Sequence, residues 1–373
     1  MQSLSPKRPR FLQLLLLALV VFAIFFSLQP ITRSQTDFYN NLWAPAYLLT
    51  QRESPYNTAS LQPELPALWM PTAVGLFSFL GFFEFNAAQQ IWFFLNIAGL
   101  ALFLHLSLPE EHLLSVLLAG MFLAYFFPPT INHFSLGQVS ILSALCLFLA
   151  VKRMERHPWR SAFFLAVGMV KPQIGFFILF GVGFYQFRSG GLKKLFSYGL
   201  KAFLAALTLT LPLFLAKPNW IPDFIASLQA NTLQWKHPSI LSQLDGWMGN
   251  WKYLPWGVLL LGAFWLIIRL WKNEPPHVAA LWTLALTVLI TPYVWSWDFV
   301  LLLPLFVYVF SISNWQGKAL LLIGYGLVWV GMAFIQLSTD FHNSRFWWAP
   351  ISFMGVLTLA AQLRHQNQIQ SKP

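Results

Sequence analysis

The sequence predicts an all-α, polytopic transmembrane protein, and its composition, its apolar runs and the pattern within those runs all indicate this class. Of 373 residues, 57% are hydrophobic and only 9% are charged, whereas an ordinary soluble domain has roughly 25% charged residues. Apolar runs recur from Phe11 to Ala361, and a helix needs ~20 such residues to cross a ~30 Å hydrocarbon core. Because the runs are continuous rather than alternating, we expect helices and not the strands of a barrel.

Thirteen apolar segments are candidate spans, so we expect about 12–13 membrane segments in a single domain that covers residues 1–373. They are 11–29, 67–83, 88–106, 113–127, 138–151, 161–171, 173–187, 198–216, 254–271, 278–292, 298–312, 319–336 and 348–362. The first follows the basic residues Lys7 to Arg10 and lacks a small-residue cleavage site, which favours an uncleaved span over a signal peptide. The weakest is 67–83, which is short and contains Pro71, so we expect it to be re-entrant or interfacial.

Lysine and arginine in short loops predict the orientation, because such loops stay on the cytoplasmic side. Lys152 to Arg160 and Arg188 to Lys194 are therefore expected inside, with both termini. Matching termini need an even number of crossings, so one of the thirteen segments should not span. The outer face then holds the loops 30–66, 128–137, 217–253 and 337–347, the Lys171-Pro172 tip and the Pro292–Asp298 junction. The loop 217–253 is rich in tryptophan, as is typical of interfacial segments.

The composition and the motifs argue against several kinds of function. The net charge of +11 resides in short loops rather than on one basic face, which argues against nucleic-acid binding. Cys146 is the only cysteine, so neither an intramolecular disulfide nor a paired-thiolate metal site can form. The sequence has no nucleotide-binding, zinc-protease or serine-hydrolase motif and no Asp-x-Asp pair. We therefore expect no metal, no cofactor and no soluble nucleotide donor.

Two ionisable residues at outer junctions are the strongest candidates for chemistry. Asp37 follows the first span; it either caps a short helix Phe38–Leu49 or acts as a general base, with a pKa raised by the low-dielectric boundary. Lys171 stands at the tip of an otherwise uncharged hairpin and precedes Pro172, which breaks the helix. It either snorkels to the head groups or holds an anionic phosphate at membrane depth.

Three further residues lie at the same outer junctions. His133 and Gln138 belong to the companion loop, and for Gln138 a simple interhelical hydrogen bond is the alternative to a role at the site. Asp298 opens the helix after the Trp-rich turn; it either caps that helix or also orients Lys171 or a sugar hydroxyl.

Taken together, the motifs at these junctions resemble a known family. The quoted motifs are Asp37-Phe38-Tyr39, Leu48-Leu49, Ser54-Pro55-Tyr56, Trp69-Met70-Pro71, Leu136-Gly137-Gln138, Gly168 to Pro172, Thr291-Pro292 and Trp297-Asp298. In order and spacing they resemble glycosyltransferase family 87, the polyprenol-phosphate-mannose-dependent α-mannosyltransferases of the C-type membrane fold. The departures are Trp69-Met70-Pro71 in place of Tyr-Pro-Pro, and Phe299 after Asp298.

The resemblance implies an inverting transfer of mannose or a related hexose from a polyprenyl-phosphate donor to a lipid or glycan acceptor. Asp37 would be the catalytic base, and Lys171, His133 and Gln138 would bind the donor phosphate. Tyr39, Tyr56, Trp297 and Asp298 would contact substrate. We expect a multi-pass protein of the bacterial inner (plasma) membrane that acts on the non-cytoplasmic side and binds no nucleic acid.

Two other functions stay open on the sequence alone. A transporter or flippase of lipid-linked sugars would also have about a dozen helices, some of them broken, but it should show paired halves and ionisable groups near the midplane. A structural or assembly subunit would need none of the polar outer junctions.

Overall fold

The computed structural model describes residues 16–22, 24–25, 35–57, 61, 67–109, 114–229, 237–338 and 342–370, with side chains up to residue 363. Within these ranges the regular elements are all helices, which confirms the predicted all-α class. The basic residues Lys7 to Arg10 lie outside the described residues. Of the predicted segment 11–29, only 16–22 and 24–25 are described, and both are helical.

Five helical stretches within the described residues are long and apolar enough to cross a membrane. They are α5 (Phe85–Ser107), α10 (Pro172–Ala216), Ile240–Asn273 with α12 (Ile240–Met248) and α13 (Tyr253–Asn273), α16 (Trp315–Gln336), and Asn343–Leu363 with η6 (Asn343–Phe346) and α17 (Trp348–Gln370). The bent pair of α6 (Leu114–Phe126) and α7 (Pro128–Leu136) makes a sixth if it is one span. Shorter apolar helices are α14 (Pro276–Ile290) and Ser296–Ile312, which joins η5 (Ser296–Leu302) to α15 (Leu303–Ile312).

Exposed apolar side chains cover the outer helices, as expected of a protein whose solvent is lipid. Only 17% of the apolar window of α10 is buried, and Phe196, Phe203 and Leu215 point outward from it. Contiguous apolar surface of this kind is rare on soluble monomers. The long apolar helices and their exposed apolar side chains therefore indicate a multi-pass membrane protein.

The centre of the bundle is α14, whose side chains are buried around most of its circumference. It packs against α8 (Ser140–Arg153), α10, α13, α15, α17 and η5. A helix that is apolar all round is stable only when other elements surround it. The turn that follows α14 leads into η5, which carries Asp298.

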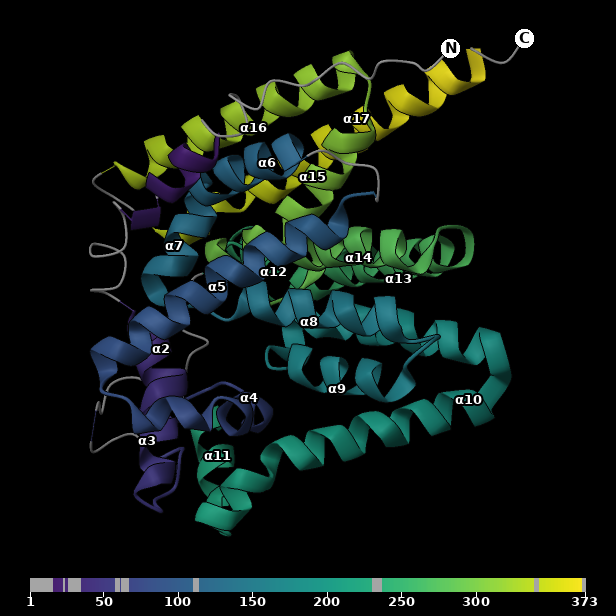
Figure 1. Cartoon of the computed structure of the whole chain (residues 1–373). Helices are drawn as coiled ribbons and strands as arrows, with labels where there is room; N and C mark the ends of the chain where they lie inside the picture. Colours follow the sequence, from purple (N-terminus) through teal and green to yellow (C-terminus); the bar gives the residue numbers. More distant parts are fainter. Residues whose placement is uncertain are drawn as a thin grey trace, which may run out of the picture.

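The segment between the two basic loops forms a hairpin, as predicted. α9 (Pro158–Gly168) is followed by a turn that contains Lys171, and α10 begins at Pro172. The segments predicted as 173–187 and 198–216 form two helical arms of α10, which meet at a kink where Gly190 and Gly191 leave helical geometry. Figure 1 shows this bend at the end of the molecule opposite α2, α7 and α11.

Short helices gather at the other end of the molecule (Figure 1). The loop 30–66 contains α2 (Thr36–Phe38), the π-helix η1 (Tyr39–Trp43) and α3 (Ala44–Thr50). The segment 67–83 forms α4 (Pro71–Leu76) and the 3₁₀ helix η3 (Ser78–Phe82), both too short to cross a membrane. The loop 217–253 is largely helical, with α11 (Trp220–Gln229), α12 and η4 (Gly249–Lys252).

Candidate active site

A glycine in the left-handed region brings α2 against the end of α7. Gly137 follows α7 with a φ of +67°, a conformation that glycine adopts without steric cost. A Cβ built on Gly137 would lie 2.5 Å from Cβ of Phe38, so α2 approaches Gly137 too closely for any side chain there. Trp92 Nε1 donates to the Gly137 carbonyl at 2.8 Å. This contact sets Asp37 beside Gln138.

Asp37 lies in the first turn of α2, which begins at Thr36. The interpretation of Asp37 as the N-cap of a helix that starts at Phe38 is therefore wrong. Its carboxylate instead accepts a hydrogen bond from Gln138 Nε2. Burial raises the pKa of Asp37 to about 6, although the Lys171 charge and the Gln138 hydrogen bond oppose the shift. The π-helix η1 follows directly, and short π-helical segments occur frequently at functional sites.

Lys171 is buried and makes three hydrogen bonds. Its Nζ donates to Gln138 Oε1 at 2.6 Å, to Ser140 Oγ at 2.9 Å and to Asp298 Oδ1 at 3.0 Å. An ammonium group has three donors, so these bonds use all of them. Gln138 is held at both ends of its amide, since its nitrogen donates to Asp37. The lysine is therefore fixed inside the protein rather than extended towards head groups.

Asp298 completes the group from η5. The side chain is 1% exposed, and its Oδ1 accepts hydrogen bonds from Lys171 and from Ser140 Oγ. Its Oδ2 accepts from the backbone N–H of Trp295 at 3.1 Å, which closes the first turn of η5. Asp298 is thus the third residue of η5 rather than its first, and it stabilises the helix start through a capping box with Trp295; the same carboxylate also bonds to Lys171.

We call Asp37, Gln138, Ser140, Lys171 and Asp298 the Lys171 network. Its members come from α2, from the start of α8, from the tip between α9 and α10 and from η5. A half-buried carboxylate with a pKa near 6 can accept a proton from a hydroxyl group. A buried ammonium beside it can stabilise negative charge as that charge develops. The arrangement suits the transfer of a group between oxygen atoms.

The structure does not bring His133 into the Lys171 network. His133 is fully buried, and its Nε2 lies 3.1 Å from Oδ1 of Asn96. Asn96 uses its own Nδ2 to donate to the carbonyl of Trp92, so Oδ1 is the acceptor and His133 the donor. Tyr39 also lies outside the network and packs against Trp43 and Phe85 at 5.2 and 4.9 Å between ring centroids.

The two remaining predicted residues have different surroundings. Tyr56 is buried; its hydroxyl donates to the Trp69 carbonyl at 3.1 Å and its ring packs on Trp220 and Phe224. Tyr56 therefore packs the loop 30–66 against helix α11 of the loop 217–253. Trp297 is half-buried beside Asp298, and its ring stacks on Trp295 at 4.8 Å between centroids.

Sequence reasoning missed Ser140 and Asn343. A serine at a helix start is common, so Ser140 carried no signal that distinguishes it from a cap. Asn343 Oδ1 accepts from the backbone N–H of Ser296 at 3.1 Å, and Asn343 Nδ2 donates to Ser296 Oγ at 2.8 Å. These two bonds anchor the start of η5, 47 residues away in the chain. Only the fold reveals such a contact.

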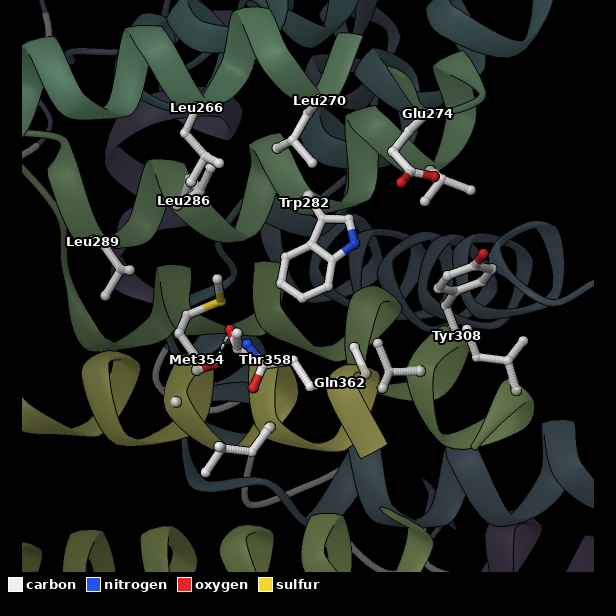
Figure 2. Close-up of a pocket in the computed structure, with 16 residues that line it drawn as sticks. Leu266, Leu270, Glu274, Trp282, Leu286, Leu289, Tyr308, Met354, Thr358 and Gln362 are labelled. Carbon is white, nitrogen blue, oxygen red and sulfur yellow. Dashed lines mark hydrogen bonds between the residues drawn. The ribbon is translucent and has the colours of Figure 1, made fainter. Parts of the chain in front are cut away.

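A large apolar pocket lies apart from these residues. It has a volume of about 1240 Å³ and is framed by α13, α14, α15 and α17. Figure 2 shows Leu266, Trp282, Tyr308 and Met354 around it. Its lining contains no member of the Lys171 network.

Comparison with known proteins identifies the family. Residues 68–292, more than half of the chain, match glycosyltransferase family 87. No curated protein matches the chain. The matched range contains Gln138, Ser140 and Lys171, whereas Asp37 and Asp298 flank it. The chain is thus a multi-pass membrane glycosyltransferase and belongs to glycosyltransferase family 87.

Proposed function

We propose that the protein transfers mannose or a related hexose from a polyprenyl-phosphate donor to a hydroxyl of a lipid or glycan acceptor, on the non-cytoplasmic side of the membrane. The observation that carries the proposal is the Lys171 network, in which one carboxylate with a raised pKa and one buried ammonium lie on either side of a shared glutamine.

The reaction follows from the roles of these groups. Asp37 takes the proton of the acceptor hydroxyl, and that oxygen forms a bond to the anomeric carbon of the donor sugar. The bond from this carbon to the phosphate oxygen breaks on the opposite side, and polyprenyl phosphate leaves. The positive charge of Lys171 stabilises the departing phosphate. A single displacement inverts the anomeric configuration.

The side of the membrane is proposed from charge. The basic stretches Lys152–Arg160 and Arg188–Lys194 belong to the α8–α9 connection and to the bend of α10. The Lys171 network occupies the tip between α9 and α10, at the other end of this hairpin. Basic loops stay cytoplasmic, which supports an outer location for the network.

Replacement of Asp37 tests the proposal. Purified Asp37→Asn in lipid vesicles should insert and fold like the wild type but lose transfer from radiolabelled polyprenyl-phosphate mannose. Asp245→Asn is the matched control, because Asp245 is exposed and pairs only with Lys252 among the described residues. Wild-type transfer by Asp37→Asn would contradict the assignment of the base. In cells, deletion of the protein should leave a glycolipid precursor that is short by one hexose.

A further inference from the structure

A histidine outside the Lys171 network stands among the aromatic residues next to it. His237 lies between α11 and α12, and its ring packs edge-to-face on Tyr293 at 4.7 Å and on Trp295 at 5.3 Å between centroids. His237 as a whole is 8% exposed. Tyr293 and Trp295 are half-buried, so the three rings form an aromatic wall that is not sealed over. We call His237, Tyr293 and Trp295 the aromatic wall.

The two ring nitrogens of His237 have different surroundings. Nδ1 is sealed from solvent and has no hydrogen-bond partner among the described residues. Nε2 is not sealed, and no described residue bonds to it. A buried N–H without a partner is rarer in proteins than a bare acceptor. The favoured tautomer therefore leaves a lone pair on Nδ1 and carries its proton on Nε2, which is then a hydrogen-bond donor.

The aromatic wall is coupled directly to the Lys171 network. The backbone N–H of Trp295 donates to Asp298 Oδ2, and Asp298 Oδ1 accepts from Lys171. Trp295 also stacks on Trp297, and the planes of the two rings differ by 9°. The indole Nε1 of Trp297 is also buried without a partner among the described residues. A buried donor without a partner is unfavourable, and an oxygen atom of a ligand would supply that partner.

This combination of groups matches the surface of a hexose. A sugar ring has an apolar C–H face that packs on aromatic rings and a rim of hydroxyl oxygens that accept hydrogen bonds. Binding sites for small molecules typically combine aromatic walls with a few placed polar groups. The donor sugar fits better than the acceptor, because it is bonded to the phosphate whose charge Lys171 would stabilise. Asp298 alone links Lys171 to Trp295 of the aromatic wall.

We propose that the aromatic wall binds the hexose ring of the donor and that His237 Nε2–H donates to one of its hydroxyl oxygens. This inference rests on the proposed function and assigns to His237 a role in recognising the sugar rather than in the chemistry.

Binding to the full chain in lipid nanodiscs tests the inference. The two probes are polyprenyl-phosphate mannose and sugar-free polyprenyl phosphate. His237→Phe keeps an aromatic ring against Tyr293 and Trp295 but removes both nitrogens, whereas His237→Gln keeps a donor. We expect His237→Phe to bind the mannosyl lipid about tenfold more weakly, the worth of one hydrogen bond, with unchanged affinity for the sugar-free lipid. His237→Gln should recover part of the loss.

His342→Phe is the matched control, since His342 is an exposed histidine of another outer loop; it should bind both lipids like the wild type. Two results would overturn the inference: unchanged binding of both lipids by His237→Phe, or an equal loss for both. Wild-type protein that binds neither lipid would instead contradict the proposed function itself. Wild-type protein that binds both lipids equally would overturn only the role of the aromatic wall.

Discussion

Nζ of Lys171 lies 3.0 Å from Oδ1 of Asp298, and both side chains are shielded from solvent. Removing one member of a buried ion pair leaves the other charge unpaired, which costs about 3–5 kcal/mol. Lys171→Met should therefore lower the melting temperature, and so should a single change of Asp298. The double variant Lys171→Met/Asp298→Leu removes both charges and should recover most of the stability.

Activity of the double variant then separates two roles for Lys171. If Lys171 stabilises the donor phosphate, the double variant should have a melting temperature near that of the wild type but a raised KM for the lipid donor and a lowered kcat. Wild-type kinetics in the double variant would reduce the pair to a structural element.

Turnover should depend on the ionisation of Asp37. Its pKa is raised from 3.8 to about 6, so the carboxylate is protonated, and unable to act as a base, below that pH. We expect kcat/KM for the donor, which reports the ionisation of the free enzyme, to rise about tenfold for each pH unit up to pH ~6 and then to level off. A pH profile of kcat/KM for the donor checks this. A profile that stays flat between pH 4.5 and 7 would show that Asp37 does not limit the reaction.

Gly137→Ala should damage the site through the backbone. The new Cβ would meet Cβ of Phe38 at 2.5 Å, and φ of +67° is unfavourable for alanine. We expect a loss of about 1–3 kcal/mol in stability and a fall in kcat, because α2 must move away from Gln138. Gly257→Ala is the control: Gly257 lies in α13 with open space around it, and the change should stabilise by about 0.5–1 kcal/mol. Equal effects of the two changes would contradict this reading.

Asn343→Ala should lower activity from outside the Lys171 network. It removes both bonds to Ser296 and loosens the start of η5, which positions Trp295 and Asp298. We expect kcat to fall about tenfold, with a stability loss of about 1 kcal/mol. Asn314→Ala provides the comparison, because Asn314 caps α16 through the backbone N–H of Gly317 and should cost similar stability at full activity. The prediction fails if both variants keep wild-type turnover.

The sequence was sufficient for the fold class and for four of the five members of the Lys171 network, but not for Ser140 or for how the members meet. Asp37, Gln138, Lys171 and Asp298 were each recognisable, since polar residues near lipid are costly and need a reason. Their contacts depend on the approach of α2 to Gly137, which is a tertiary feature. His133 was expected near Lys171; among the described residues no hydrogen bond joins the two, and its Nε2 lies 3.1 Å from Oδ1 of Asn96.

Local sequence patterns also misjudged some element boundaries. The basic stretch Arg188 to Lys194 was expected as a loop, but it is helical except where Gly190 and Gly191 bend α10. The loop 217–253 was identified by its tryptophans, whereas its amphipathic helices α11 and α12 were not anticipated. His237 follows α11 and carried no motif, so only its contacts with Tyr293 and Trp295 single it out.

Lys171 bonds to one carboxylate and lies near a second, and this arrangement has an electrostatic consequence. With Asp37 ionised, the two carboxylates and one ammonium of the network carry a formal charge of −1, so an anionic lipid would enter against repulsion. Binding of the donor should therefore draw a proton onto Asp37, and that proton must leave again before Asp37 can act as a base. Affinity for the donor and the rate of transfer should then respond to pH in opposite directions, so that proton uptake and release become part of each catalytic cycle.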